Sequence, residues 1–156
     1  MKTKLFDKKY YILLSLIVLV VMVYYSDVQS FWHDELYQLG LSGRGNTFGQ
    51  MIDNYAQLWD YTPPFYAILM WVWIRLVPLS ARWLLLPSEV FVTIGVFLIA
   101  LSGEKIAGKK AGIIASILAG TSSTLILGAG HEFRAYSLLF LTSALLLYVF
   151  VLRYQE

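Results

Sequence analysis

Long apolar runs separated by short polar segments dominate the hydropathy pattern of this chain. Four runs come close to the roughly twenty mostly apolar residues that a membrane-crossing helix needs. They are Tyr10–Tyr25, Trp83–Leu101, Ala111–Gly130 and Tyr136–Leu152. A fifth run, Pro64–Leu79, is shorter, contains Arg75 and is bounded by prolines. The pattern predicts an all-α membrane protein with about four transmembrane helices.

The polar and aromatic region between the first run and Pro64 predicts two short helices. "DELYQLGLSG" begins with Asp34 as a candidate N-cap and ends at Gly43. In "TFGQMIDNYAQLW", Thr47 and Gln50 have the spacing of a capping box. The apolar residues of this second stretch share one helical face, which fits a helix in the membrane interface or one packed on neighbouring protein. They are Phe48, Met51, Ile52, Tyr55 and Trp59.

Composition agrees with a membrane protein, because 58% of the residues are hydrophobic and 14% are charged. Soluble domains are nearer half apolar and a quarter charged. The chain has no cysteine, which excludes disulfides and thiolate metal sites. The basic start and the first apolar run resemble a signal peptide. Because no small-residue cleavage site follows Val23, we predict that this segment is an uncleaved first helix.

The distribution of basic residues predicts the topology, because Lys and Arg in short loops favour the cytoplasm. If the run Pro64–Leu79 does not cross, all seven lysines and Arg153 lie inside, and the four remaining arginines lie outside. Five crossings would divide the basic residues less cleanly between the two sides of the membrane. We therefore expect four spans, both termini in the cytoplasm, and an outer loop over residues 26–82 that carries interfacial helices. A tilted or re-entrant crossing of residues 64–79 is the alternative.

The third span carries small residues every four positions, a spacing that lets helix backbones approach closely in lipid. They are Gly108, Gly112, Ser116, Gly120, Thr124 and Gly128. We interpret them as a packing feature.

Two clusters of ionisable residues fall on the predicted outer face. "FWHDELYQ" holds His33, Asp34 and Glu35 after the first span, and "HEFRAYS" holds His131, Glu132 and Arg134 before the last. If the second cluster forms a helical turn, His131 and Arg134 are neighbours, and so are Glu132 and Tyr136. Acids beside a bilayer are paired or mark a substrate path.

Structural explanations compete with the functional one. Asp34 by itself is better explained as a helix cap, and Glu132 and Arg134 fit a local ion pair. His131 fits a surface histidine, or one with satisfied hydrogen bonds, better than a metal ligand. Neither "GRGNTFG" nor "GEKIAGKK" has the spacing of a nucleotide-binding loop.

Four segments in order resemble one family of membrane enzymes. They are "FWHDELYQ", "YTPPFYAILMWVW", "SARWLLLPSEVFVTIGVFLIALSGEKIAGKKAG" and "GHEFRAYSLLFLTSALLLY". Together they resemble the GT-C glycosyltransferases of the dolichyl-phosphate-mannose protein mannosyltransferase and aminoarabinose transferase type. The resemblance implies transfer of a sugar from a polyprenyl-phosphate carrier to an acceptor on the outer face.

The resemblance also implies roles for individual residues. Asp34 maps to the catalytic acid of the first outer loop, with Glu35 beside it, and Glu132 and Arg134 map to polar residues of the second outer loop. Aminoarabinose transferases carry an aspartate near the place of Tyr136, so that substrate is disfavoured and any role of a second acid falls to Glu132.

The chemistry of such a transfer fits these residue types. A hydroxyl acceptor needs a general base, here Asp34, and the lipid phosphate that leaves needs a cation, for which Arg134, Arg82 and Arg75 are candidates. His131 and Tyr136 complete the expected substrate-binding set. A divalent metal that bridges Asp34, His131 or Glu132 to the phosphate is an alternative that no spacing signal supports.

Members of this family are several times longer, so we expect residues 1–156 to be one transmembrane module from the N-terminal part of such an enzyme, inactive alone. The rival hypothesis is a non-catalytic small membrane protein or subunit derived from one. A transporter is disfavoured, because the ionisable residues cluster at the outer mouth and not at mid-membrane. The sugar, the carrier and the acceptor are left open.

Overall fold

The computed structural model describes residues 8–28, 30–57 and 64–154, and this part of the chain is all helical, as predicted. The helices are α1 (Lys9–Tyr25), α2 (His33–Ser42), α3 (Phe48–Gln57), α4 (Phe65–Leu76), α5 (Ala81–Ala107), α6 (Lys109–Gly120), the π-helix η2 (Thr124–Ala129) and α7 (Tyr136–Tyr154).

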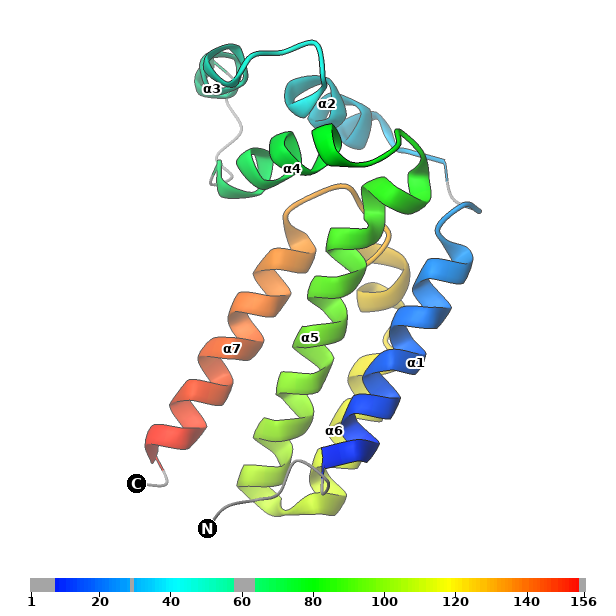
Figure 1. Cartoon of the computed structure of the whole chain (residues 1–156). Coiled ribbons are helices and arrows are strands. Elements are labelled where there is room, and N and C mark those ends of the chain that lie inside the picture. The colour runs from blue at the N-terminus through cyan, green and yellow to red at the C-terminus, as the bar shows by residue number, and fades with distance from the viewer. Residues whose placement is uncertain (1–7, 29, 58–63, 155–156) are drawn as a thin grey trace.

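A bundle of long helices carries a layer of short ones across one end (Figure 1). Helices α1, α5, α6 and α7 run side by side, and α5 is central because it packs against the other three. Two of the four predicted spans, α5 and α7, are long and apolar enough to cross a membrane, whereas α1 is a shorter apolar helix of 17 residues.

Helix α4 lies across the end of the bundle and does not run alongside α5 and α7 (Figure 1). It has 12 residues, which is about 18 Å of helix at 1.5 Å per residue, well short of a bilayer core. Helix α4 therefore belongs to the layer of short helices across the end of the bundle, and the assignment of residues 64–79 to an outer loop stays a prediction.

A proline inside α5 helps to attach α4 to the bundle. Pro87 has no backbone N–H, so the carbonyl of Trp83 lacks its usual helical donor. The indole Nε1 of Trp73, on α4, donates to that carbonyl at 2.7 Å. An apolar cluster that includes Tyr66 and Met70 of α4 and Leu85 of α5 packs beside it.

The two predicted short helices both exist, with one correction. Thr47 and Gln50 form the expected reciprocal capping box at the start of α3, with bonds of 2.9 and 3.2 Å. The apolar face of α3 packs on neighbouring protein, because Met51 and Tyr55 lie in a buried cluster with Leu41 and Ala67. Trp59 lies outside the described residues. Helix α2 stops before Gly43 as predicted, but it begins at His33 with Trp32 as N-cap, so the assignment of Asp34 as the N-cap was wrong.

The third apolar run is not one helix, contrary to the prediction of a continuous span over Ala111–Gly130. Helix α6 ends at Gly120, and η2 begins at Thr124. The hydroxyl of Thr121 bonds back to the carbonyl of Ile117 at 2.8 Å, the kind of local bond that competes with helix continuation in Ser- and Thr-rich stretches. The hydropathy pattern could not reveal this break.

Most of the stripe of small residues packs as expected. A Cβ on Gly112 would lie 2.7 Å from both the carbonyl oxygen of Ala100 and the hydroxyl of Tyr11, and one on Gly120 would lie 2.7 Å from Val18. Gly108 has a different task, because it turns the chain between α5 and α6 with a positive φ of 85°. Gly128 has open space where its Cβ would be.

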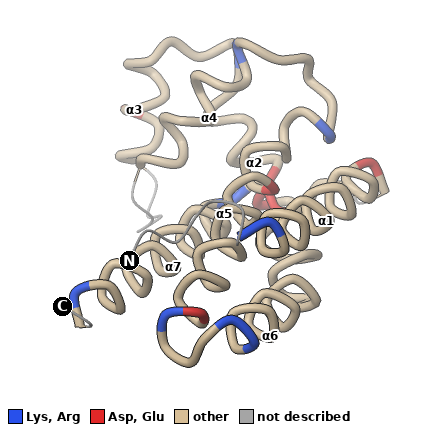
Figure 2. Tube along the Cα trace, turned by 60° about the horizontal axis from the view of Figure 1, so that its bottom comes forward, with Lys and Arg blue, Asp and Glu red and all other residues tan. Residues whose placement is uncertain are grey.

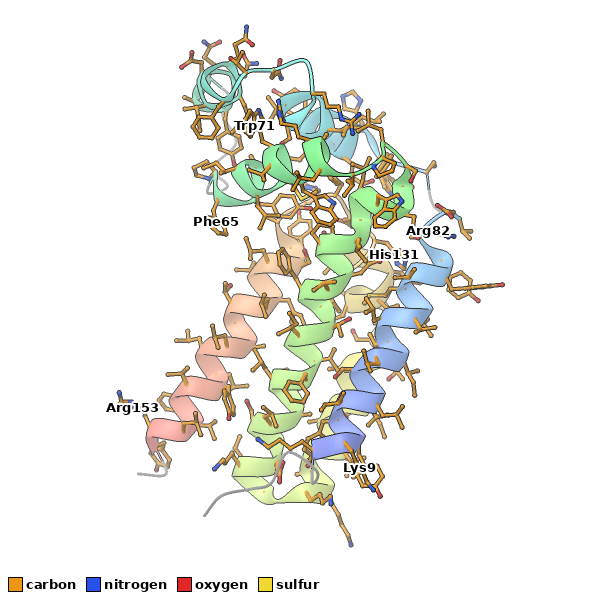
Figure 3. All side chains as sticks on the ribbon, viewed as in Figure 1. Lys9, Phe65, Trp71, Arg82, His131 and Arg153 are labelled. Carbon is orange, nitrogen blue, oxygen red and sulfur yellow. The ribbon has the colours of Figure 1, made fainter. Side chains whose placement is uncertain are left out.

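Basic residues gather at the two ends of the bundle. Figure 2 shows one group around the turn between α5 and α6 and another around α2 and α4. In Figure 3, Lys9 and Arg153 lie at one end of the bundle, and Arg82 and His131 lie at the other. The described lysines occupy the start of α1, the end of α5 and the start of α6, which the fold brings to the same end.

Candidate functional site

The two ionisable clusters of the sequence meet at the end of the bundle that α2 and α4 cover. Asp34 belongs to the first turn of α2, and Arg134 lies in the turn just before α7. The Oδ2 atom of Asp34 and the Nη1 atom of Arg134 are 3.1 Å apart. This ion pair joins residues 100 positions apart, and its side chains are 66% and 34% exposed, so both charges face an open surface.

Glu35, adjacent to Asp34, points inward and is 1% exposed. Its Oε2 accepts the backbone N–H of Trp32 at 2.7 Å, and its Oε1 accepts the backbone N–H of Phe133 at 2.6 Å. Glu35 thus closes the start of α2 and joins it to the turn that carries Arg134. Both carboxylate oxygens are thus occupied by backbone donors, which holds the first turn of α2, with Asp34, against the turn before α7.

Three consecutive residues fix the turn between η2 and α7, which is not the helical turn considered from the sequence. Both ring nitrogens of His131 face backbone carbonyls, the carbonyl of Glu132 accepts the hydroxyl of Ser88 on α5 at 3.1 Å, and the N–H of Phe133 binds Glu35. The ring of Phe133 is fully buried and packs edge-on against Tyr66. These bonds leave the side chains of Glu132 and Arg134 as the outward-facing groups of the turn.

His131 itself is buried below the site, with 3% of its surface exposed. Its Nδ1 lies 2.6 Å from the carbonyl oxygen of Ile126 in η2, and its Nε2 lies 2.8 Å from that of Met22 in α1. The Oε1 of Glu89, on α5, is 3.9 Å from the same Nε2. His131 therefore supports the turn from below and does not line the exposed site.

An open cavity of about 220 Å³ adjoins the ion pair, lined by Trp32, Asp34, Glu35, Glu132 and Arg134. Burial raises the pKa of the Glu132 carboxyl above its ordinary value, and the charges of Glu35 and Asp34 raise it further, while Arg134 acts in the opposite direction. The cavity thus holds a cation, an ionised partner and a second acid that binds its proton more tightly than usual.

A groove of about 440 Å³ runs between η2 and α7 and shares Glu132 with this cavity. Its walls are mostly apolar, with Leu139 and Phe140 of α7 on one side and Gly128 of η2 on the other. Tyr136 also lines it, and the guanidinium of Arg134 lies 4.9 Å from the centre of the Tyr136 ring. Glu132 and Tyr136 therefore stand between a polar cavity and an apolar groove.

The remaining candidate arginines lie apart from the cavity. Arg82 pairs with Asp27 at 2.6 Å. The guanidinium of Arg75 stacks on Trp71 and binds backbone carbonyls that include those of Gly43 and Asn46, so it fixes the loop before α3. Among the described residues, Arg134 is the arginine that lines the cavity with Asp34.

Within residues 8–28, 30–57 and 64–154, no group of three or more His, Asp or Glu side chains gathers in a way that could hold a metal ion. The metal alternative therefore gains no support from the geometry of Asp34, His131 and Glu132.

Sequence reasoning assigned no role to two neighbouring residues of α5: Ser88, which binds the turn, and Glu89, which lies 3.9 Å from His131. An acid inside an apolar span is a signal of paired or functional burial, so Glu89 could have been found from the sequence. The bond from Ser88 carries no comparable signal, because serines are common in such helices.

Comparison with family models, with curated proteins and with solved structures gave no match. The family resemblance read from the sequence motifs therefore stays a prediction.

Proposed function

We propose that the chain carries the catalytic site of a glycosyltransferase that moves a sugar from a polyprenyl-phosphate carrier to an acceptor on the outer face of the membrane. The observation that supports this proposal most directly is the Asp34–Arg134 pair, which unites two distant segments beside Glu132 and an open cavity. A carboxylate and a guanidinium on one surface are the groups that such a transfer needs.

In the proposed reaction, the acceptor hydroxyl oxygen attacks the anomeric carbon of the sugar. The new bond forms between these two atoms, and the bond between the anomeric carbon and the phosphate oxygen breaks. The phosphate leaves with the bonding electrons, and Arg134 binds its negative charge. Asp34 takes the proton of the acceptor hydroxyl, so charge and atoms balance without another reactant.

The ion pair also gives the site an order of events. A phosphate is a strong partner for a guanidinium, so the donor headgroup competes with Asp34 for Arg134. When the phosphate binds Arg134, the Asp34 carboxylate loses its counterion and becomes available to the acceptor. The free protein thus keeps its base paired until the donor arrives.

The groove between η2 and α7 supports a lipid-linked substrate. It is mostly apolar, it lies on helices of the bundle, and it shares Glu132 with the polar cavity. An amphiphilic ligand can place a hydrocarbon chain in the groove and a polar headgroup near Arg134. The π-helix that forms one wall fits this proposal, because such segments occur frequently at functional sites.

The charge distribution supports the proposed orientation. The described lysines lie at the end of the bundle away from the Asp34–Arg134 pair, and basic loops favour the cytoplasm. The site then faces the outside of the cell membrane, and both termini lie in the cytoplasm.

The test measures sugar transfer from a polyprenyl-phosphate donor in membranes that contain the full-length gene product. Asp34→Asn should abolish transfer and leave the amount of protein unchanged. Asp53→Asn, which removes an exposed acid of α3 away from the cavity, should have no effect. Full transfer by the Asp34→Asn variant would remove Asp34 from the mechanism, and no transfer by the unmodified protein would favour the non-catalytic alternative.

A further inference from the structure

Below the proposed site lies a buried pair of ionisable side chains that the transfer mechanism does not use. The side chains of His131 and Glu89 are 2% and 0% exposed, and the Nε2 of His131 lies 3.9 Å from the Oε1 of Glu89. Glu89 is on α5, and within the described part of the chain both of its carboxylate oxygens lack a hydrogen-bond partner. Such isolation is unusual for a buried acid, because buried polar groups are almost always paired.

The ring of His131 lies between two hydrogen-bond acceptors. The Nδ1 and the Nε2 each face a backbone carbonyl oxygen, at 2.6 and 2.8 Å. A carbonyl oxygen accepts and cannot donate, so a neutral ring would leave one unprotonated nitrogen against an oxygen lone pair. Both contacts are favourable when the ring carries a proton on each nitrogen.

A buried cation needs a counterion, and Glu89 supplies one. Two further charged residues near this end of α5, Arg82 and Asp27, pair with each other at 2.6 Å. Glu132 and Arg134 follow His131 in the chain but line the exposed cavity above. The Met22 carbonyl belongs to the last turn of α1, where the negative end of the helix dipole also favours a cation. The Ile126 carbonyl belongs to η2.

We propose that His131 is a buried imidazolium held by Glu89, and that this pair is a positioning device for the turn that carries Glu132 and Arg134. The cationic ring ties the turn to α1 and η2 at once, and Glu89 of α5 keeps it cationic. Loss of the Glu89 charge would neutralise the ring, release one of the two carbonyls and loosen the turn. The consequence for ligand binding rests on the proposed function, but the protonation state of the pair does not.

Nitrogen-15 NMR of the protein in lipid nanodiscs tests the pair directly. The chain has two histidines, and His33 is exposed, so His33→Gln leaves His131 as the single imidazole signal. At neutral pH we expect both ring nitrogens to resonate as protonated. Adding Glu89→Gln should convert one nitrogen to the unprotonated form, and Glu89→Asp should preserve the protonated signature. Glu104→Gln, a control at the other end of α5, should leave the spectrum unchanged.

An unprotonated ring nitrogen in the His33→Gln chain at neutral pH would overturn the proposal, whether or not the Glu89→Gln variant folds. An unchanged spectrum in a folded Glu89→Gln variant would overturn the role of Glu89.

In a second measurement, Glu89→Gln should weaken the binding of polyprenyl phosphate about tenfold at neutral pH, and acidic pH should restore binding. Absence of binding by the unmodified protein would count against the proposed function alone, since the NMR result stands apart from it.

Discussion

Two adjacent acids, Asp34 and Glu35, have opposite surroundings. Asp34 is exposed and shares an ion pair with Arg134, whereas Glu35 is buried with both oxygens bound to backbone amides. The sequence "FWHDELYQ" shows that two acids stand together, but it does not reveal which one faces inward. That choice depends on where α2 begins, and Trp32 rather than Asp34 takes the N-cap position.

The first prediction separates these two acids by their effect on stability. Glu35→Gln replaces one accepting oxygen with an amino group that faces a backbone N–H, so we expect a loss of about 2–3 kcal/mol in the free energy of unfolding. Asp34→Asn should cost less than about 1 kcal/mol, because exposed ion pairs contribute little. Thermal unfolding in detergent compares the two variants. Equal losses would contradict the different roles assigned to the two residues.

The second prediction concerns the Glu132 carboxyl, whose pKa is raised first by burial and then by Glu35. A raised carboxyl pKa means that the folded protein binds this proton more tightly than the unfolded chain does. Its contribution to stability is therefore fully present below the ordinary glutamate range and is lost as the pH rises through the raised pKa.

Glu132→Gln removes the titrating carboxyl, and with it the loss of stability that occurs as the pH rises. The free energy of unfolding of the variant, minus that of the unmodified protein, should be larger at neutral pH than at acidic pH. The increase should be at most about 1 kcal/mol, because the carboxyl is partly exposed. Unfolding midpoints measured across this pH range give the comparison. A variant whose relative stability falls as the pH rises would show that the sign is wrong.

At the scale of elements, hydropathy and capping signals predicted most helices. The Thr47–Gln50 capping box and the stop at Gly43 were read correctly, because these signals are local. The break between α6 and η2 was missed, because Thr121 looks compatible with a span until its hydroxyl bonds back to Ile117. The stripe of small residues was read correctly as a packing feature, but the sequence could not show that Gly128 lies outside the contact.

The third prediction uses this difference between two glycines. Gly112→Ala would place a methyl group 2.7 Å from the Ala100 carbonyl and the Tyr11 hydroxyl, so α6 must move away from α5 and α1. We expect a loss of about 1–3 kcal/mol from this overpacking. Gly128→Ala meets open space and should cause no loss. Thermal unfolding of the two variants tests the packing, and equal tolerance of both would contradict the helix contacts.

At the scale of the molecule, the site exists because the fold joins two distant segments. Residue types alone made Asp34 and Arg134 candidates, but the contact between them depends on Glu35, Ser88 and His131, which hold α2 and the turn on the same end of the bundle. Such long-range bonds have no signature in a single sequence. The separation of lysines from the site, in contrast, was predicted from the sequence, and the fold reproduces it for the lysines that the structure describes.

The fourth prediction tests the proposed orientation with single cysteines, which the cysteine-free chain allows without a background signal. Thr47→Cys, before α3, should react with a membrane-impermeant thiol reagent added outside intact cells. Lys109→Cys, at the start of α6, should react only after the cells are opened. Both positions are exposed in the structure. Labelling of Lys109→Cys from outside would contradict the orientation.

The most direct test of the central claim is the affinity of the purified protein, in nanodiscs, for polyprenyl phosphate. If Arg134 holds the phosphate and Asp34 competes for it, Arg134→Gln should weaken binding by about tenfold or more, the scale of a lost charge-assisted bond. Asp34→Asn should bind at least as tightly as the unmodified protein, because it frees the guanidinium. Unchanged binding by Arg134→Gln, or weakened binding by Asp34→Asn, would contradict a phosphate site built on this pair.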